Sequence, residues 1–168
     1  NDNLNELILS LDDLKDTTIL ITLPNADPDN LKIISCFKKF ANNNPNVYLF
    51  KSLGQINYFS LLSLVDGVLG NSSSGLLEAP YFCKGTINIG DRQRGRLKAN
   101  SVIDCLPNAE SISEALSKLY SKKFKEKLHN IESPYGKKGA SKNIYKIIKK
   151  IEFDNLIQKK FFDVDFNL

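Results

Sequence analysis

The chain has 168 residues, of which 42% are hydrophobic and 25% are charged, and its formal net charge is +4. These values are ordinary for a soluble globular protein that has enough residues for one domain and a real core. The charge is too small to indicate a nucleic-acid partner by itself, and no apolar run approaches the roughly 20 residues of a membrane span.

The cysteines and the histidine give no sign of a metal or disulfide site. Cys36, Cys83 and Cys105 are scattered and odd in number, which favours reduced thiols in a cytoplasmic protein. His129 lies in a polar segment away from any cysteine or acidic pattern, so a surface histidine is favoured over a ligand. The N-terminus is polar and acidic, unlike a secretory signal. We therefore expect a cytoplasmic protein without a metal or cofactor.

Short apolar runs alternate with amphipathic stretches along the first half of the chain. Apolar side chains recur at helical spacing in residues 3–14, and residues 29–42 and 55–64 predict two further helices. Residues 17–23 and 47–50 have the composition of buried parallel strands. The large apolar side chains of the third helix are more typical of a core than of a site: Tyr58, Phe59, Leu61 and Leu62.

The second half continues this alternation. Residues 64–69 and 86–89 predict strands, and residues 101–104 predict a short edge strand. A helix is expected from about residue 75 to residue 81, where Pro80 ends or kinks it. Further helices are expected at residues 110–120 and 140–152, the first with four apolar side chains turned inward: Ile112, Ala115, Leu116 and Leu119.

The basic run at residues 122–127 favours a solvated helix face over a nucleic-acid patch. Strands and helices that alternate along a chain favour an α/β, Rossmann-like parallel sheet with helices on both faces. Right-handed crossovers then bring the loops after the strands to one edge, where open α/β sheets bind ligands. We expect one domain over residues 1–152 and a tail over residues 153–168.

The loop at residues 70–74 is built from small, mostly hydroxylated residues. A strand–turn–helix junction of this kind presents unpaired backbone N–H groups and the positive end of a helix dipole. Phosphate is the usual occupant of such a junction. The loop alone supports a phosphate site and a serine that caps the helix in a surface turn equally well. Its spacing matches neither a Walker loop nor a dinucleotide fingerprint.

Charged side chains near this loop extend the phosphate hypothesis to a nucleotide. Glu78 lies one helical turn after Ser74, so the two residues should share a helix face. A carboxylate suits a vicinal diol, whose two hydroxyls can donate to its two oxygens. Three arginines follow the strand at residues 86–89 and could supply cations to a nucleotide: Arg92, Arg94 and Arg96. Surface ion pairs are the alternative role of these arginines.

Residues 70–96 resemble the nucleotide-binding core of the UDP-N-acetylglucosamine 2-epimerases, in particular the hydrolysing type of sialic-acid and legionaminic-acid synthesis. The match is long and ungapped, and further matches lie at residues 23–27, 100–105 and 133–136. The resemblance spans nearly all of the chain but only the C-terminal half of such an enzyme. Since the chain also lacks methionine, we expect a fragment of a longer protein.

The resemblance implies a two-domain fold of the glycosyltransferase B type, with a UDP-sugar held between the halves. This chain would be the half that holds UDP. In relatives the paired serines hold the diphosphate, the glutamate holds the ribose hydroxyls, and the backbone of the loop at residues 51–54 meets the base. The resemblance thus implies six UDP-contacting residues: Asn25, Leu53, Ser72, Ser73, Glu78 and Arg92. For Asn25, a residue of a simple turn is the alternative role.

The implied reaction removes UDP from UDP-N-acetylglucosamine, or a related 2-acetamido sugar, by elimination across C1–C2. Water then adds and gives the free 2-epimer. In relatives the acidic catalytic groups come mostly from the N-terminal half, and a histidine-bearing loop near the start of the C-terminal half faces the diphosphate. The one histidine here is His129, so no catalytic residue can be named. We expect this chain alone to be inactive, with the missing half as its partner in a homo-oligomeric enzyme.

Two other functions remain open from the sequence. A glycosyltransferase of the same fold also presents a glutamate to ribose at a helix start, and it would transfer sugar to an acceptor. A non-catalytic nucleotide- or nucleic-acid-binding module would show a steep salt dependence of RNA binding and no preference for uridine. The loop at residues 91–96 resembles the epimerases rather than the transferases.

Overall fold

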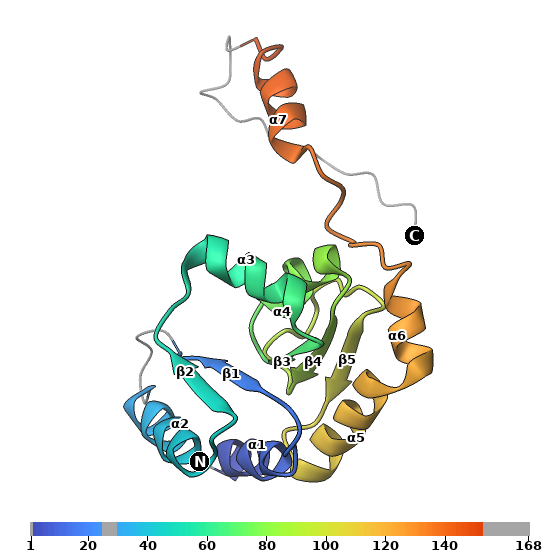
Figure 1. Cartoon of the computed structure of the whole chain (residues 1–168). Helices are drawn as coiled ribbons and strands as arrows, with labels where there is room; N and C mark the ends of the chain where they lie inside the picture. Colours follow the sequence, from blue (N-terminus) through green and yellow to red (C-terminus); the bar gives the residue numbers. More distant parts are fainter. Residues whose placement is uncertain (1, 25–29, 153–168) are drawn as a thin grey trace, which may run out of the picture. The chain divides into compact units, whose positions relative to one another are not determined.

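The computed structural model describes residues 2–24 and 30–152 and divides into two compact units, Asn1–Tyr135 and Gly136–Leu168. The strands of the first unit are β1 (Ile19–Thr22), β2 (Val47–Phe50), β3 (Gly67–Gly70), β4 (Gly85–Ile89) and β5 (Val102–Cys105) (Figure 1). Its helices are α1 (Asp2–Asp12), α2 (Asn30–Asn43), α3 (Gly54–Leu64), α4 (Ser74–Leu77), the 3-10 helix η1 (Ala79–Phe82), α5 (Ala109–Tyr120) and α6 (Lys122–Leu128). The second unit contains α7 (Ala140–Ile148), and the expected tail at residues 153–168 lies outside the described residues.

Every strand pair in the described part of the chain is parallel. β1 pairs with β2, and β4 lies between β3 and β5, which makes β5 an edge strand as expected. Helices lie on both sides, because Ile87 of β4 packs against α5 while Thr86, on the opposite face, bonds Gly75 of α4. The predicted α/β fold is confirmed. One feature differs from the expected single sheet: the strands form two separate ladders, because β1 and β3 do not pair.

The main core lies between β4, β5 and the helices α5 and α6. The side chain of Asn108 caps the start of α5 by accepting the N–H of Ser111 at 2.9 Å. A second core joins α1, α2 and β2, and Leu7 and Leu14 pack against both cores. As the helical spacing predicted, α5 buries Ile112, Ala115, Leu116 and Leu119.

Glycine at the start of β4 lets the helices pack closely on the sheet. A Cβ atom at Gly85 would lie 2.4 Å from Cδ1 of Leu119 and 2.8 Å from a ring carbon of Phe124. Nonbonded carbon atoms do not approach so closely without a shift of one of them. A side chain at position 85 would therefore require Leu119 of α5 and Phe124 of α6 to move.

The strands that border the break between the ladders are less buried than the sequence predicts. Every residue of β3 is half-buried, whereas all of β4 except Ile89 is buried. β1 is likewise half-buried, and its last residue, Thr22, is exposed. The prediction of fully buried strands assumed a continuous sheet covered on both faces. Each of these two strands instead has one unpaired edge.

The helix expected at residues 75–81 is in fact two short segments. α4 ends at Leu77, and the 3-10 helix η1 follows at Ala79. Pro80 lies in the first turn of η1, where a missing N–H costs no hydrogen bond. A one-turn helix adds only a small dipole. The expected anion site therefore depends on the backbone N–H groups and the serine hydroxyls rather than on a long helix.

Several surface features agree with the sequence. The basic residues of α6 and His129 are exposed, and the three cysteines are free. In the second unit, α7 carries apolar side chains that are all exposed: Ile144, Tyr145, Ile147 and Ile148.

Replacement of Ile112 by alanine should lower the free energy of unfolding by about 2–4 kcal/mol, because the side chain is fully buried in the main core. Ile56→Ala is the matched control, since Ile56 is also helical but 82% exposed. It should change stability by less than about 0.5 kcal/mol. Urea unfolding followed by far-ultraviolet circular dichroism measures both. Equal losses for the two variants would contradict the assigned core.

Candidate functional site

An open hollow of about 430 Å³ lies at the carboxyl ends of β1 and β2. Its volume is within the range of small-molecule sites. Side chains and backbone from three separate stretches line it: Thr22, Leu23, Lys51, Ser52, Leu53, Gly54, Gln55, Tyr58, Phe59 and Glu78. The hollow therefore lies at the sheet edge where parallel α/β folds bind ligands.

Leu53 and Glu78, which are distant in sequence, both line this hollow. Leu53 immediately precedes α3, and Gly54 allows the turn there with a φ of +67°. Glu78 lies between α4 and η1 and is half-buried. Phe59 of α3 packs on Phe82 of η1 with ring centroids 5.6 Å apart. This contact holds the segment that carries Glu78 against α3.

The loop after β3 at residues 70–74, called the serine loop below, contains three serines in different environments. The hydroxyl of Ser72 accepts the N–H of Ser74 at 3.4 Å. Ser73 occupies the N-cap position of α4, but its side chain makes no capping hydrogen bond. The hydroxyl of Ser74 is hydrogen-bonded to the hydroxyl of Tyr58. The capping role that the sequence left open for Ser73 is therefore absent in this structure.

Tyr58 connects the serine loop with the hollow, and sequence reasoning assigned it to the core. It is half-buried, lines the hollow and bonds Ser74. Burial raises the pKa of Tyr58, the hydrogen bond with Ser74 lowers it, and the negative charge of Glu78 raises it, so that the pKa is above its usual value. Tyr58 is thus a neutral hydroxyl at neutral pH. The only sequence signal for this role was the phenol hydroxyl itself, beside the apolar side chains of Phe59, Leu61 and Leu62.

Strand β4 holds the segment that follows the serine loop, the start of α4, against the sheet. The hydroxyl of Thr86 in β4 donates to the backbone oxygen of Gly75 at 2.8 Å, and both residues are buried. A Cβ atom at Gly75 would lie 2.4 Å from Cγ2 of Thr86. Only glycine therefore allows the start of α4 to lie this close to the sheet.

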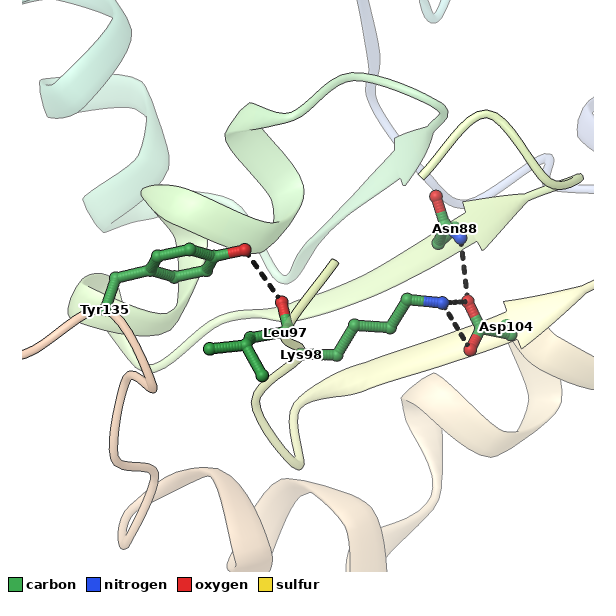
Figure 2. Close-up of polar contacts among 5 residues, drawn as sticks. All are labelled: Asn88, Leu97, Lys98, Asp104 and Tyr135. Atoms are coloured by element: carbon green, nitrogen blue, oxygen red, sulfur yellow. Dashed lines mark hydrogen bonds and ion pairs between the residues drawn. The ribbon is translucent and has the colours of Figure 1, made fainter. Parts of the chain in front are cut away.

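The loop after β4 that carries Arg92, Arg94 and Arg96, called the arginine loop below, is fixed at Gln93, Leu97 and Lys98. Lys98 forms an ion pair with Asp104 of β5 at 2.7 Å, and Asp104 also accepts from the amide of Asn88 at 2.7 Å (Figure 2). The hydroxyl of Tyr135 donates to the backbone oxygen of Leu97 at 2.9 Å (Figure 2). The third point is a contact with the serine loop, where the amide of buried Gln93 donates to the backbone oxygen of Asn71 at 2.7 Å.

These contacts also determine the charge state of Asp104. Partial burial raises the pKa of its carboxyl group, but hydrogen bonds from Lys98 and Asn88 and the positive charge of Lys98 lower it. The net effect is a pKa below the usual value, so Asp104 is ionised at neutral pH and the ion pair with Lys98 persists. The arginine loop is therefore anchored to β5 across the ordinary pH range.

The predicted site residues divide into three groups. Leu53 and Glu78 line one hollow, and the serine loop is tied to that hollow through Ser74 and Tyr58. Arg92 is exposed, and Arg92, Ser72 and Ser73 are all absent from the lining of the hollow. Arg92 adjoins Gln93, which contacts the serine loop. Asn25 lies outside the described residues.

The described residues contain neither a membrane-spanning helix nor a grouping of side chains suited to a metal ion. In residues 2–24 and 30–152, no helix combines the length and the apolar character that crossing a membrane requires. Within the same ranges, no three histidine, cysteine or acidic side chains are grouped as a metal would need. The hollow and its adjoining loops remain the candidate site.

Comparison with known proteins identifies relatives over nearly the whole chain. The family described as UDP-N-acetylglucosamine 2-epimerase matches residues 1–149. GDP/UDP-N,N'-diacetylbacillosamine 2-epimerase (hydrolyzing) from Campylobacter jejuni is 37% identical over 94% of this chain and 41% of its own length. Polysialic acid biosynthesis protein P7 from Escherichia coli is 34% identical over 98% of this chain and 42% of its own length.

Solved structures show the same fold. UDP-GlcNAc 2-epimerase from Methanocaldococcus jannaschii, in complex with UDP-GlcNAc and UDP, superposes with a TM-score of 0.70 at 18% identity, over 88% of this chain and 41% of that one. This likeness confirms the expected fold of one half of a protein of the glycosyltransferase B type. The chain spans about two fifths of the length of the relatives it matches. The match to the family favours the epimerases over the glycosyltransferase and nucleic-acid alternatives, and the chain belongs to the UDP-N-acetylglucosamine 2-epimerase family.

Proposed function

We propose that this chain is the UDP-binding, C-terminal half of a hydrolysing UDP-N-acetylglucosamine 2-epimerase. The observation that carries the proposal is the hollow that Leu53 and Glu78 share, because the family resemblance assigns these two residues to the base and to the ribose of one uridine. The named activity of the Campylobacter jejuni relative supports the hydrolysing type. The whole enzyme would act in the cytoplasm as a homo-oligomer.

The half-buried carboxylate of Glu78 suits the ribose of UDP. Its two oxygens can accept both hydroxyls of a vicinal diol, and a partly desolvated carboxylate makes stronger hydrogen bonds than an exposed one. The backbone at residues 51–54 lies across the same hollow and offers donors and acceptors to a base. A nucleoside is therefore a better fit for the hollow than a phosphate alone.

The serine and arginine loops suit the diphosphate. The hydroxyl of Ser73 makes no capping bond, so it is available to an oxyanion. Gln93 ties the arginine loop to the serine loop, which places cationic side chains near the same ligand. Preorganised donors of this kind stabilise a departing diphosphate in the transition state.

In the proposed reaction this chain would bind UDP and stabilise the leaving group. UDP departs from C1 of the sugar as a proton leaves C2, and water then adds to give the free 2-epimer. The acid–base groups for C2 would come from the rest of the enzyme. The sequence and the hollow provide no candidate for them, so the isolated chain should bind UDP without turning over the sugar nucleotide.

Calorimetric titration of UDP, UMP and ADP into the purified chain tests the proposal directly. UDP should bind more tightly than UMP because of the second phosphate, and more tightly than ADP because of the base. The same preparation should release no UDP from UDP-N-acetylglucosamine. Equal affinity for UDP and ADP would contradict a uridine site, and turnover would contradict the assignment of catalysis to the missing half.

Replacement of Glu78 by glutamine should weaken UDP about tenfold, because hydrogen bonds to a charged partner contribute roughly 1.5–3 kcal/mol. Pyrophosphate binding should not weaken, since the ribose contact is absent from that ligand. Glu114→Gln is the control, because Glu114 is exposed on α5. Equal losses of affinity for UDP and pyrophosphate would show that Glu78 does not bind the ribose hydroxyls.

Replacement of Ser73 by alanine should weaken UDP and pyrophosphate alike, by roughly tenfold, because the hydroxyl is assigned to an ionised phosphate. Ser117→Ala, on the exposed face of α5, is the matched control. Competition binding against a fluorescent UDP derivative would measure both ligands. Unchanged affinities would mean that the Ser73 hydroxyl does not contact the phosphates and that only its backbone can do so.

A further inference from the structure

One side chain of the arginine loop is buried, although its neighbours in the loop are exposed. Gln93 is 3% exposed, whereas Asp91, Arg92 and Arg94 are exposed. Burial removes a polar amide from water, so hydrogen bonds within the protein have to replace those to the solvent. One replacement is present, because Nε2 of Gln93 donates to the backbone oxygen of Asn71 at 2.7 Å. The arginine loop is thus joined to the serine loop through a single buried amide.

The other end of the same amide has no partner. Within the described part of the chain, Oε1 of Gln93 is buried and accepts no hydrogen bond. A buried acceptor without a donor lowers stability, and an apolar side chain of similar shape would avoid this loss. Rotation of the amide would not help, since it would place two acceptor oxygens together at Asn71. Stability alone therefore does not account for a glutamine at this position.

Gln93 also lies where two tight turns of the arginine loop overlap. In the first turn the N–H of Arg94 donates to the backbone oxygen of Asp91 at 2.8 Å. In the second turn the N–H of Arg96 donates to the backbone oxygen of Gln93 at 3.3 Å. Gly95 has a φ of +79° there, which glycine adopts without strain. Because the two turns share Gln93 and Arg94, a contact at Gln93 positions the whole segment that carries the arginines.

On the other side of this contact, the serine loop is held at both ends. Asn71 directly follows Gly70, the last residue of β3, and is the residue that Gln93 contacts. At the far end, Thr86 of β4 donates to the backbone oxygen of Gly75. The three serines lie between these two anchors. The bond from Gln93 therefore limits where the serine hydroxyls can lie relative to the arginine loop.

The charge of the arginine loop explains why an uncharged anchor is useful. Among residues 2–24 and 30–152, Arg92, Arg94 and Arg96 form no ion pair. Like charges within a short segment repel one another, which favours a spread loop. A neutral amide can hold the loop in place without neutralising any guanidinium group. The positive charge then stays available to an anionic ligand.

We propose that Gln93 is the positioning residue that joins the serine and arginine loops into one phosphate site. This inference rests on the proposed binding of UDP. Gln93 does not touch the ligand; it acts through Asn71 on one loop and through the two turns on the other. Without its amide, the hydroxyls and guanidinium groups would remain, but their separation would no longer be fixed. The nucleoside would be unaffected, since Gln93 does not line the hollow.

Two variants of the whole chain separate positioning from stability. Gln93→Met removes both the donor and the unpaired oxygen while it keeps the length of the side chain. Asn46→Leu is the matched control, because the amide of Asn46 also joins two backbone segments, through the oxygens of Leu14 at 3.1 Å and Thr17 at 2.7 Å. Asn46 directly precedes β2, so it lies at the amino ends of the strands, opposite the hollow. NMR titration measures affinities for UDP, pyrophosphate and uridine, and urea unfolding measures stability.

In Gln93→Met the affinities for UDP and pyrophosphate should each fall about tenfold, which corresponds to the loss of one hydrogen bond of ordinary strength. The affinity for uridine should change by less than about twofold, because the nucleoside shares no contact with Gln93. The urea midpoint should fall no further than in Asn46→Leu, since the lost bond is offset by removal of the unpaired oxygen. Asn46→Leu should leave all three affinities unchanged.

A measurement on the native chain requires neither variant. The backbone amide resonances of Ser73 and Arg94 should both shift on addition of pyrophosphate and should do so with the same midpoint, because one ligand contacts both loops. Different midpoints, or no shift in one loop, would overturn the inference.

Three results with the variants would also overturn it. Unchanged pyrophosphate affinity in Gln93→Met would mean that the amide does not position the loops. Equal losses for uridine and pyrophosphate, or equal losses in Asn46→Leu, would indicate a general loosening of the fold. A Gln93→Met chain that does not fold would assign the amide to stability. By contrast, equal affinity of the native chain for UDP and ADP would contradict the uridine site and leave this inference intact.

Discussion

The parallel direction of the strands is the constraint on which the candidate site depends. Parallel strands all end at the same edge, so the loops after β1, β2 and β3 reach a common region although they are distant in sequence. The hollow at that edge contains Leu53 from the loop before α3 and Glu78 from the segment after α4. Antiparallel pairing would have placed these loops at opposite ends of the sheet.

Polar contacts between loops convert this proximity into a defined arrangement. The hydrogen bond between Tyr58 and Ser74 ties α3 to the serine loop, and the bond from Gln93 ties the arginine loop to the same place. Thr86 holds the start of α4 on the sheet. A ligand at this edge would therefore meet donors whose positions are already limited, which reduces the ordering cost of binding.

The distribution of burial reflects the division of the sheet. Around β4 and α5 the packing is complete, with Ile87 and Ile112 fully buried. At β1 and β3 the strands are only half-buried and one edge of each is unpaired. α1 spans both hydrophobic cores and is thus the element that keeps the two ladders in one unit. The packing is therefore most complete around β4 and least complete along the break between β1 and β3.

The sequence alone determined the order of strands and the inner face of α5, because these follow from local periodicity, and its resemblance to the epimerases identified the family. It predicted neither the break between β1 and β3, nor the short α4, nor the role of Tyr58. These depend on which segments meet in three dimensions. Strand pairing and side-chain contacts join residues far apart in the chain, so periodicity within a single segment carries no information about them.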